Sequence, residues 1–125
     1  MKENRRAVGK IGEDAAAKLL EDEGCRILCR NYTAHGGEID IIADYKEYLL
    51  FVEVKLRKLG GSSAAGAIDE TKRARLVTAA EQFLEEYKDN PYIGLLVPRF
   101  DAVEVYTADG TIAKLHHINN IFAAV

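Results

Sequence analysis

Charged side chains interrupt two apolar segments whose composition otherwise predicts strands of a sheet. Segment 49–57 has the apolar density of a central strand, yet Glu53 and Lys55 alternate with apolar residues along one face of it. The apolar segment before it carries Glu38 and Asp40 at the same spacing. Carboxylates gathered on one sheet face can bind a hard divalent cation, and a lysine beside them can act on water or phosphate. These residues are therefore the candidates for chemistry.

The pairing of the two segments decides whether the carboxylates converge. A four-residue turn at Asp44–Glu47 sets Asp40 opposite Phe51. The same register sets Glu38 opposite Glu53, and directly opposed residues share a face. Asp40 and Glu53 are then diagonal neighbours about 7–8 Å apart, so their carboxylates can reach one ion. A hairpin with one solvent-facing side explains the same charges without any ion.

Both predicted helices also carry a charged residue where an apolar one is expected. Lys72 lies between Ile68 and Leu76 at i,i+4 spacing, where an unpaired ammonium would cost several kcal/mol. Glu13 lies seven residues before Leu20, at the edge of the buried arc of the first helix. A snorkelling lysine and a capping-type glutamate are alternatives for each residue taken alone. The common explanation is one polar pocket that receives Glu13, Asp40, Glu53, Lys55 and Lys72.

Three carboxylates with lysine favour a particular class of metal ion. Zinc prefers Cys and His, whereas Mg²⁺ and Mn²⁺ accept carboxylate oxygens and keep several waters. Either ion lowers the pKa of a bound water and neutralises charge that develops on a phosphate. A lysine beside the ion would orient or deprotonate that water and stabilise the transition state. The residues therefore indicate hydrolysis of phosphodiester bonds with Mg²⁺ or Mn²⁺ as the cofactor.

Hydrophobic periodicity predicts the elements that position these residues. With 125 residues, 48% of them hydrophobic, the chain has room for one compact domain over residues 1–125. The pattern predicts a helix, three strands, a helix and two strands. The segments are Arg5–Glu23 (helix), Ile27–Tyr32, Glu38–Ala43 and Tyr48–Arg57 (strands), Leu59–Gly66 (loop), Ala67–Tyr87 (helix), and Arg99–Tyr106 and Ile112–Ile118 (strands joined at Asp109–Gly110).

Asp40, followed after a hairpin by Glu53-Val54-Lys55, resembles the D…(D/E)xK signature of the PD-(D/E)xK nuclease superfamily. A wider set of motifs resembles the YraN family (UPF0102), small proteins thought to be akin to archaeal Holliday junction resolvases. In order, the motifs are Gly9-x-x-Gly12-Glu13-x-x-Ala16, Asn31-Tyr32, Gly37-Glu38-Ile39-Asp40-Ile41-Ile42-Ala43, Phe51-Val52-Glu53-Val54-Lys55, Lys72-x-x-x-Leu76 and Arg99-Phe100-Asp101. The proline of the superfamily name is absent, because Ile39 precedes Asp40.

The resemblance implies a fold and a site. The fold is α/β, a restriction-endonuclease-like αβββαβ core with a central mixed sheet flanked by two helices. Asp40 and Glu53 would be ligands of Mg²⁺ or Mn²⁺, and Lys55 would activate water. Glu13 would be an auxiliary acid, and Lys72 a phosphate or transition-state contact. The implied function is a metal-dependent endonuclease acting on DNA, with branched or structured DNA as a substrate class. The alternative is a nucleic-acid-binding or repair-associated protein with this fold and little or no turnover.

The distribution of charge bears on the partner. The net charge is −3, yet setting aside the four acids Glu13, Glu38, Asp40 and Glu53 leaves −3 + 4 = +1 for the rest of the chain. Basic residues concentrate near the start of both helices and at the end of the third strand, which suits contact with phosphates. Scatter of charge on solvated faces is the alternative explanation. The candidates for nucleic-acid binding are Arg5, Arg6, Lys10, Arg57, Lys58, Arg73 and Arg75.

Other features limit the cellular setting. No apolar run is long enough for a membrane helix, and the N-terminal residues do not form a signal peptide, so a cytoplasmic protein without a membrane partner is expected. Cys25 and Cys29 are expected to be reduced packing residues. Arg99 and Asp101 share a strand face and predict a structural ion pair at the rim of the pocket. Cleavage of a junction would require two sites, which leaves a homodimer open as the working unit.

Overall fold

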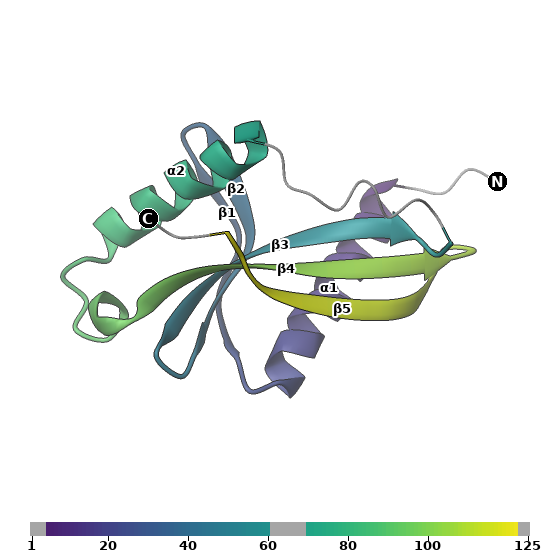
Figure 1. Ribbon diagram of the computed structural model, residues 1–125, viewed down its shortest axis with the longest axis horizontal. Helices are drawn as coiled ribbons and strands as arrows, with labels where there is room; N and C mark the ends of the chain where they lie inside the picture. The colour runs from purple at the N-terminus through teal and green to yellow at the C-terminus, as the bar shows by residue number, and fades with distance from the viewer. Residues whose placement is uncertain (1–4, 61–69, 123–125) are drawn as a thin grey trace.

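A five-stranded mixed sheet forms the centre of the molecule, in the spatial order β1-β2-β3-β4-β5 (Figure 1). The structure is a computed structural model that describes residues 5–60 and 70–122. Strands β3 and β4 run parallel, and the other neighbouring pairs are antiparallel. The strands are β1 (Arg26–Ala34), β2 (Gly37–Tyr45), β3 (Tyr48–Lys58), β4 (Val97–Ala108) and β5 (Thr111–Phe122).

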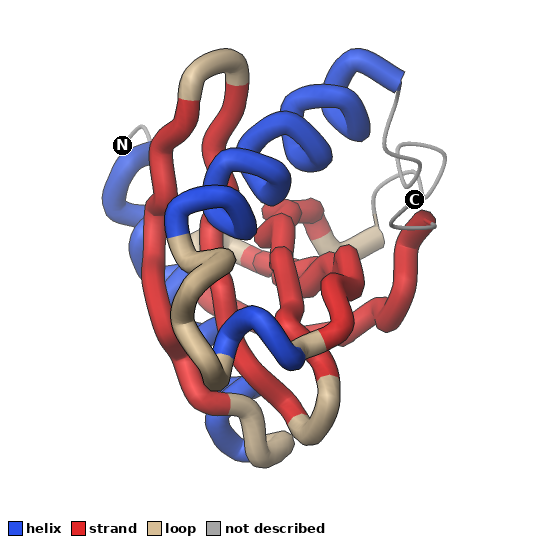
Figure 2. The backbone as a smooth tube through the Cα atoms, turned by 90° about the vertical axis from the view of Figure 1, so that its left-hand side faces the viewer, coloured by secondary structure: helices blue, strands red, loops and turns tan. Residues whose placement is uncertain are grey.

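Two helices, α1 (Arg5–Asp22) and α2 (Glu70–Glu86), cover opposite faces of the sheet. In Figure 2, α2 crosses in front of the strands and α1 lies behind them. The alternation along β3 explains this arrangement, because successive side chains point to opposite faces. Leu50 and Val52 pack with α1, whereas Leu49 and Phe51 pack with α2. The predicted α/β core with a mixed sheet between two helices is therefore confirmed.

The β2–β3 hairpin has a shorter turn than the one predicted. Tyr45 pairs with Tyr48, so the turn is the two residues 46–47, and Ile42 lies opposite Phe51. The predicted four-residue turn and the pairing of Asp40 with Phe51 are wrong. Lys46 adopts a left-handed backbone conformation with φ 54°, which lets the chain reverse within two residues. Because the error is two residues, and a strand has a period of two, the predicted facing of each side chain is unchanged.

Most of the predicted elements match the structure to within a few residues. The second helix begins at Glu70 within the described chain, and the parts of the predicted loop and helix at 61–69 lie outside the described residues. The Asp109–Gly110 turn is confirmed, because both residues have positive φ, 52° and 77°. A short 3₁₀ helix at Ile93–Leu95 was not predicted. No helix within 5–60 and 70–122 has the length and apolar composition needed to cross a membrane.

Candidate functional site

Three of the predicted acidic residues line one hollow between α2 and the strands β2 and β3. The hollow has a volume of about 590 Å³, and we call it the carboxylate pocket. Its wall includes both charged residues and the glycine tip of the β1–β2 hairpin. The lining residues are Thr33, Gly36, Gly37, Glu38, Asp40, Glu53, Val54, Lys72, Arg75 and Leu76. The sequence therefore correctly predicted that Asp40, Glu53 and Lys72 come together.

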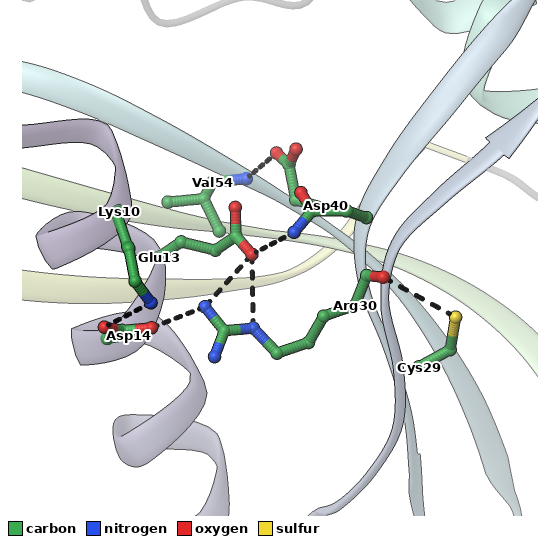
Figure 3. A network of polar contacts seen from close by, with 8 residues as sticks. Lys10, Glu13, Asp14, Cys29, Arg30, Asp40 and Val54 are labelled. Atoms are coloured by element: carbon green, nitrogen blue, oxygen red, sulfur yellow. Dashed lines mark hydrogen bonds and ion pairs between the residues drawn. The ribbon is translucent and has the colours of Figure 1, made fainter. Parts of the chain in front are cut away.

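The end of the β2–β3 ladder fixes the position of Asp40. Backbone pairing between these strands runs as far as Ile41 and Val52. Just beyond this pair, Asp40 Oδ2 accepts a hydrogen bond from the backbone N–H of Val54 at 2.8 Å (Figure 3). A carboxylate thus accepts a bond of the kind that a backbone carbonyl accepts inside the ladder. This contact holds the Asp40 side chain against the edge of β3.

Burial and neighbouring acids shift the protonation of Asp40. Burial, which is the largest cause, and the charges of neighbouring acids together raise the pKa of this carboxyl to about 6, and the Val54 N–H offsets only part of their effect. The acids are Glu13, Glu53 and Glu38, and Glu13 has the largest effect of the three. A carboxyl crowded by other acids is poorly stabilised as an anion until a cation arrives. The electrostatics therefore suit a binding site for positive charge.

Glu53 is the most deeply buried acid of the pocket, with a side chain only 6% exposed. Its Oε1 lies 2.5 Å from the Lys72 ammonium, which reaches in from the first turn of α2. Its Oε2 is buried and has no hydrogen-bond partner among the described residues. A buried carboxylate oxygen without a hydrogen-bond donor is energetically unfavourable unless a ligand supplies a donor or a positive charge. The lysine placed on the apolar stripe of its helix is thus explained by its ion pair with Glu53.

Lys55 follows Glu53 on the same side of β3 and is half-buried. Burial lowers the pKa of its ammonium, while the charge of Glu53 works in the opposite direction. Lys55 is outside the lining of the carboxylate pocket and lies beside it. A lysine with a lowered pKa is closer to exchanging a proton with water than an exposed lysine is.

Glu13 lies in a neighbouring hollow rather than in the carboxylate pocket. That hollow of about 610 Å³ is lined by Gly9, Lys10, Glu13, Arg30 and Asn31. Figure 3 shows the Arg30 guanidinium reaching from β1 to Glu13 and Asp14 on α1. The single pocket expected for all five residues is therefore divided in two, because Arg30 and Asn31 draw the Glu13 carboxylate toward β1. Its charge still acts on Asp40 across the boundary.

The donor set fits a hard divalent cation with an incomplete protein shell. The described part of the chain holds no group of three or more His, Cys, Asp or Glu side chains arranged for a metal ion. The available donors are the carboxylates of Asp40 and Glu53, and one buried oxygen of Glu53 has no partner in the part of the chain that the structure describes. Mg²⁺ is commonly held by one or two carboxylates and retains its waters. The residues present therefore fit Mg²⁺ or Mn²⁺ and do not fit a closed zinc site.

Some of the residues predicted to contact nucleic acid are exposed, and others contact side chains of the protein itself. Arg75 lines the carboxylate pocket, and Lys58 and Lys10 are exposed, although Lys10 also contacts Asp14. Arg73 packs over the Phe122 ring. The Arg57 guanidinium bonds Glu104 at 3.1 Å and is mostly buried, because the parallel register brings β4 alongside it. The side chains of Arg5 and Arg6 lie outside the described part of the chain.

Asp101 belongs to a separate buried cluster. It is fully buried and pairs with Arg99, as predicted, at 2.7 Å. It also contacts the ring of His117, which reaches Glu23 with its other nitrogen. Arg99 and His117 line a different hollow, shared with Glu23 and Cys25, so the expected place at the pocket rim is wrong.

Two residues of the site were missed from the sequence. Arg30 and Asn31 bind Glu13, but nothing in the apolar pattern of β1 marks them as functional. The available signal was the Asn31-Tyr32 pair, which stands among the family motifs without an assigned role. Tyr32 itself packs against Phe83 and bonds Glu86, which is a core-edge role.

Comparison with known proteins places the chain in a family. A family model described as "Uncharacterised protein family UPF0102" matches residues 12–105, a range that contains Glu13 and the whole carboxylate pocket. A UPF0102 protein of Caldanaerobacter subterraneus subsp. tengcongensis is 37% identical over 124 residues, covering 97% of this chain and 98% of the relative. A UPF0102 protein of Pelotomaculum thermopropionicum is 36% identical over 126 residues, covering 98% of this chain and all of the relative. A third relative, from Herminiimonas arsenicoxydans, is 40% identical over 103 residues, covering 81% and 82%. The chain belongs to the UPF0102 family.

Proposed function

We propose that this protein is a Mg²⁺- or Mn²⁺-dependent endonuclease that hydrolyses phosphodiester bonds in DNA, with branched or structured DNA as its substrate class. The observation that carries the proposal is the buried Oε2 of Glu53, which has no hydrogen-bond partner within residues 5–60 and 70–122 and lies in a pocket shared with Asp40. Both carboxylates are held in place by the chain, Asp40 through Val54 and Glu53 through Lys72. A preorganised pair of this kind is suited to a cation that would act on a phosphate.

The chain's own residues account for the steps of hydrolysis. When bound by Asp40 and Glu53, the ion supplies an acidic water and positive charge beside the phosphate. Lys55 orients the attacking water and accepts or relays its proton. Lys72 and Arg75, on the opposite wall, bind the phosphate and stabilise the negative charge that builds on it. The water oxygen bonds to phosphorus as the bond to the leaving sugar oxygen breaks, and that oxygen takes up a proton.

One observation favours the second candidate, a nucleic-acid-binding or repair-associated protein with little turnover. Lys72 already neutralises one oxygen of Glu53 at 2.5 Å, so a divalent cation competes with an ammonium for that carboxylate. In this alternative, the ion pair is permanent and the basic residues serve binding alone. Measured turnover separates the two candidates, because binding to DNA is expected from both.

Cleavage of supercoiled plasmid and of a synthetic four-way junction, with Mg²⁺, Mn²⁺ or EDTA, tests the proposal. We expect metal-dependent nicking by the wild-type chain and a loss of about 100-fold or more in Asp40→Asn and Glu53→Gln. Glu47→Gln, an exposed acid in the β2–β3 turn, is the matched control and should cleave normally. Equal cleavage by all four proteins would exclude the carboxylate pocket as the site. Binding without cleavage by the wild type would support the second candidate.

A further inference from the structure

Asn31 has an unusual backbone conformation at the point of β1 that lies opposite Asp40 of β2. Its φ is 53°, in the left-handed region, inside strand β1. The β1–β2 ladder pairs Arg30 with Ile41 and Tyr32 with Ile39. The position between these pairs, where Asn31 faces Asp40, is skipped without any change of register. The ladder is thus interrupted directly opposite the acid that we assign as a metal ligand.

The Asn31 side chain uses this conformation to reach α1. Its Nδ2 donates a hydrogen bond to Glu13 Oε1 at 2.9 Å. The same oxygen accepts a bond from Arg30 Nε at 3.1 Å, so two adjacent residues of β1 hold one oxygen of Glu13. The Glu13 side chain is 17% exposed, and a carboxylate held by two donors has little freedom to turn toward solvent.

We propose that Asn31 is a positioning residue of the candidate nuclease site. Asn31 lies in β1, which pairs with the strand that carries Asp40, and its side chain bonds the Glu13 carboxylate and holds it beside Asp40. The inference rests on the proposed function. The interruption at Asn31 and the bond to Glu13 have one consequence: a third negative charge, which is paired with Arg30, stays beside the proposed metal ligand Asp40 (Figure 3). That charge strengthens the attraction for a divalent cation without requiring Glu13 to touch it.

Asparagine satisfies two requirements at this position. Asparagine tolerates positive φ better than most residues because its short polar side chain bonds locally. Glycine would accept the same backbone but has no donor for Glu13. Aspartate would also accept the backbone, yet it would set a second carboxylate against Glu13 Oε1. The two substitutions therefore remove the bond while leaving the fold of β1 intact.

The test compares Asn31→Gly and Asn31→Asp with Asn120→Gly. Asn120 has φ 56° in β5, so this control makes the same change at a left-handed asparagine outside the site. We measure Mn²⁺ affinity by calorimetry, plasmid nicking, and the thermal midpoint of unfolding. For Asn31→Gly we expect a loss of about tenfold in Mn²⁺ affinity or nicking rate. Asn31→Asp removes the same bond but brings a negative charge of its own, so its loss should be smaller, and the midpoint of Asn31→Gly should match that of Asn120→Gly.

The possible results separate this inference from the proposed function. Wild-type affinity and nicking in Asn31→Gly would overturn the positioning role while leaving the nuclease site standing. An equal loss in Asn120→Gly would also overturn it, because the effect would then follow from flexibility in any strand. A wild-type chain that neither binds Mn²⁺ nor nicks DNA would overturn the proposed function and this inference together.

Discussion

Asp40 Oδ2 accepts the backbone N–H of Val54 at 2.8 Å, across the point where β2 and β3 cease to pair. The bond joins the predicted metal ligand to the middle residue of the Glu53-Val54-Lys55 motif. The position of β3 at this point therefore depends on a side chain that we propose as a metal ligand. Because the carboxyl is buried among other acids, its ionised form is unfavourable in the fold. The proposed function of Asp40 therefore opposes the stability of the fold, and this opposition can be measured.

Asp40→Asn should stabilise the protein at neutral pH while removing metal-dependent cleavage. The asparagine oxygen can still accept the Val54 N–H, but residue 40 no longer carries a buried charge. The folded-state pKa of Asp40 is raised from 3.8 to about 6, so the penalty develops as pH rises through that interval. Above it, the gain should be on the order of 2–3 kcal/mol. Urea unfolding at neutral pH and near pH 4 measures the difference, which should be small at the lower pH. A gain that is equal at both would show that charge is not its cause.

Lys72→Ala should destabilise the fold by about 1–3 kcal/mol, because it leaves the buried Glu53 carboxylate without its ammonium partner. Added Mn²⁺ should raise the unfolding midpoint of this variant more than that of the wild type. The double variant Lys72→Ala/Glu53→Gln should recover most of the loss, since no unpaired charge remains. Lys18→Ala, which removes an exposed pair with Asp22, is the control and should change stability by less than about 1 kcal/mol. Additive effects in the double variant would contradict a direct Glu53–Lys72 coupling.

The grouping of Asp40, Glu53 and Lys72 could be predicted from sequence because each interrupts a periodic apolar pattern. The prediction that these side chains share a face stayed correct although the turn was wrong, because a shift of two residues keeps each side chain on the same face of its strand. The turn itself could not be predicted: Lys46 adopts positive φ although lysine does not favour it, so tertiary pairing decides the conformation. The place of Glu13 was also beyond the sequence, because it depends on Arg30 and Asn31, which meet α1 only in the folded chain. The ion pair of Arg57 was beyond the sequence for the same reason, since its partner Glu104 lies 47 residues away.

Arg75→Ala should weaken binding to DNA and reduce its dependence on salt. Arg75 lines the carboxylate pocket from α2, where a phosphate would meet it. Loss of one phosphate contact should lower the slope of log affinity against log salt by about 1. Lys88→Ala removes the same charge just beyond the other end of α2, where the ammonium pairs with Glu85. Fluorescence anisotropy across a salt series compares the two. Equal effects would indicate a general charge attraction with no preference for the pocket.

Because of His117, the free energy of unfolding should fall as pH rises above 6.5. Its two ring nitrogens contact Glu23 and Asp101 at 2.6 and 2.8 Å, and both can donate only when the ring is protonated. Burial opposes this charge, but the two hydrogen bonds outweigh it and raise the pKa of His117 above 6.5. The stabilisation is therefore full below pH 6.5 and is lost as pH rises through the folded-state pKa. His117→Gln should lose more stability near pH 5.5 than near pH 9, as measured by urea unfolding. A constant loss would show that the ring acts through packing alone.

Gly37→Ala should separate the hairpin tip from α2 and disturb the wall of the carboxylate pocket. A Cβ at this glycine would collide with the backbone carbonyl of Arg75, and backbone atoms cannot move aside as a flexible side chain can. The collision should cost about 1–3 kcal/mol and displace the helix that supplies Lys72 and Arg75. Cleavage and DNA affinity should therefore fall together. Gly9→Ala is the matched control, because no described atom outside the local helix backbone lies within 4 Å of its added Cβ and alanine favours the helix by about 0.5–1 kcal/mol. If Gly37→Ala unfolds at the wild-type midpoint and cleaves normally, close contact between this hairpin and α2 is not what shapes the site.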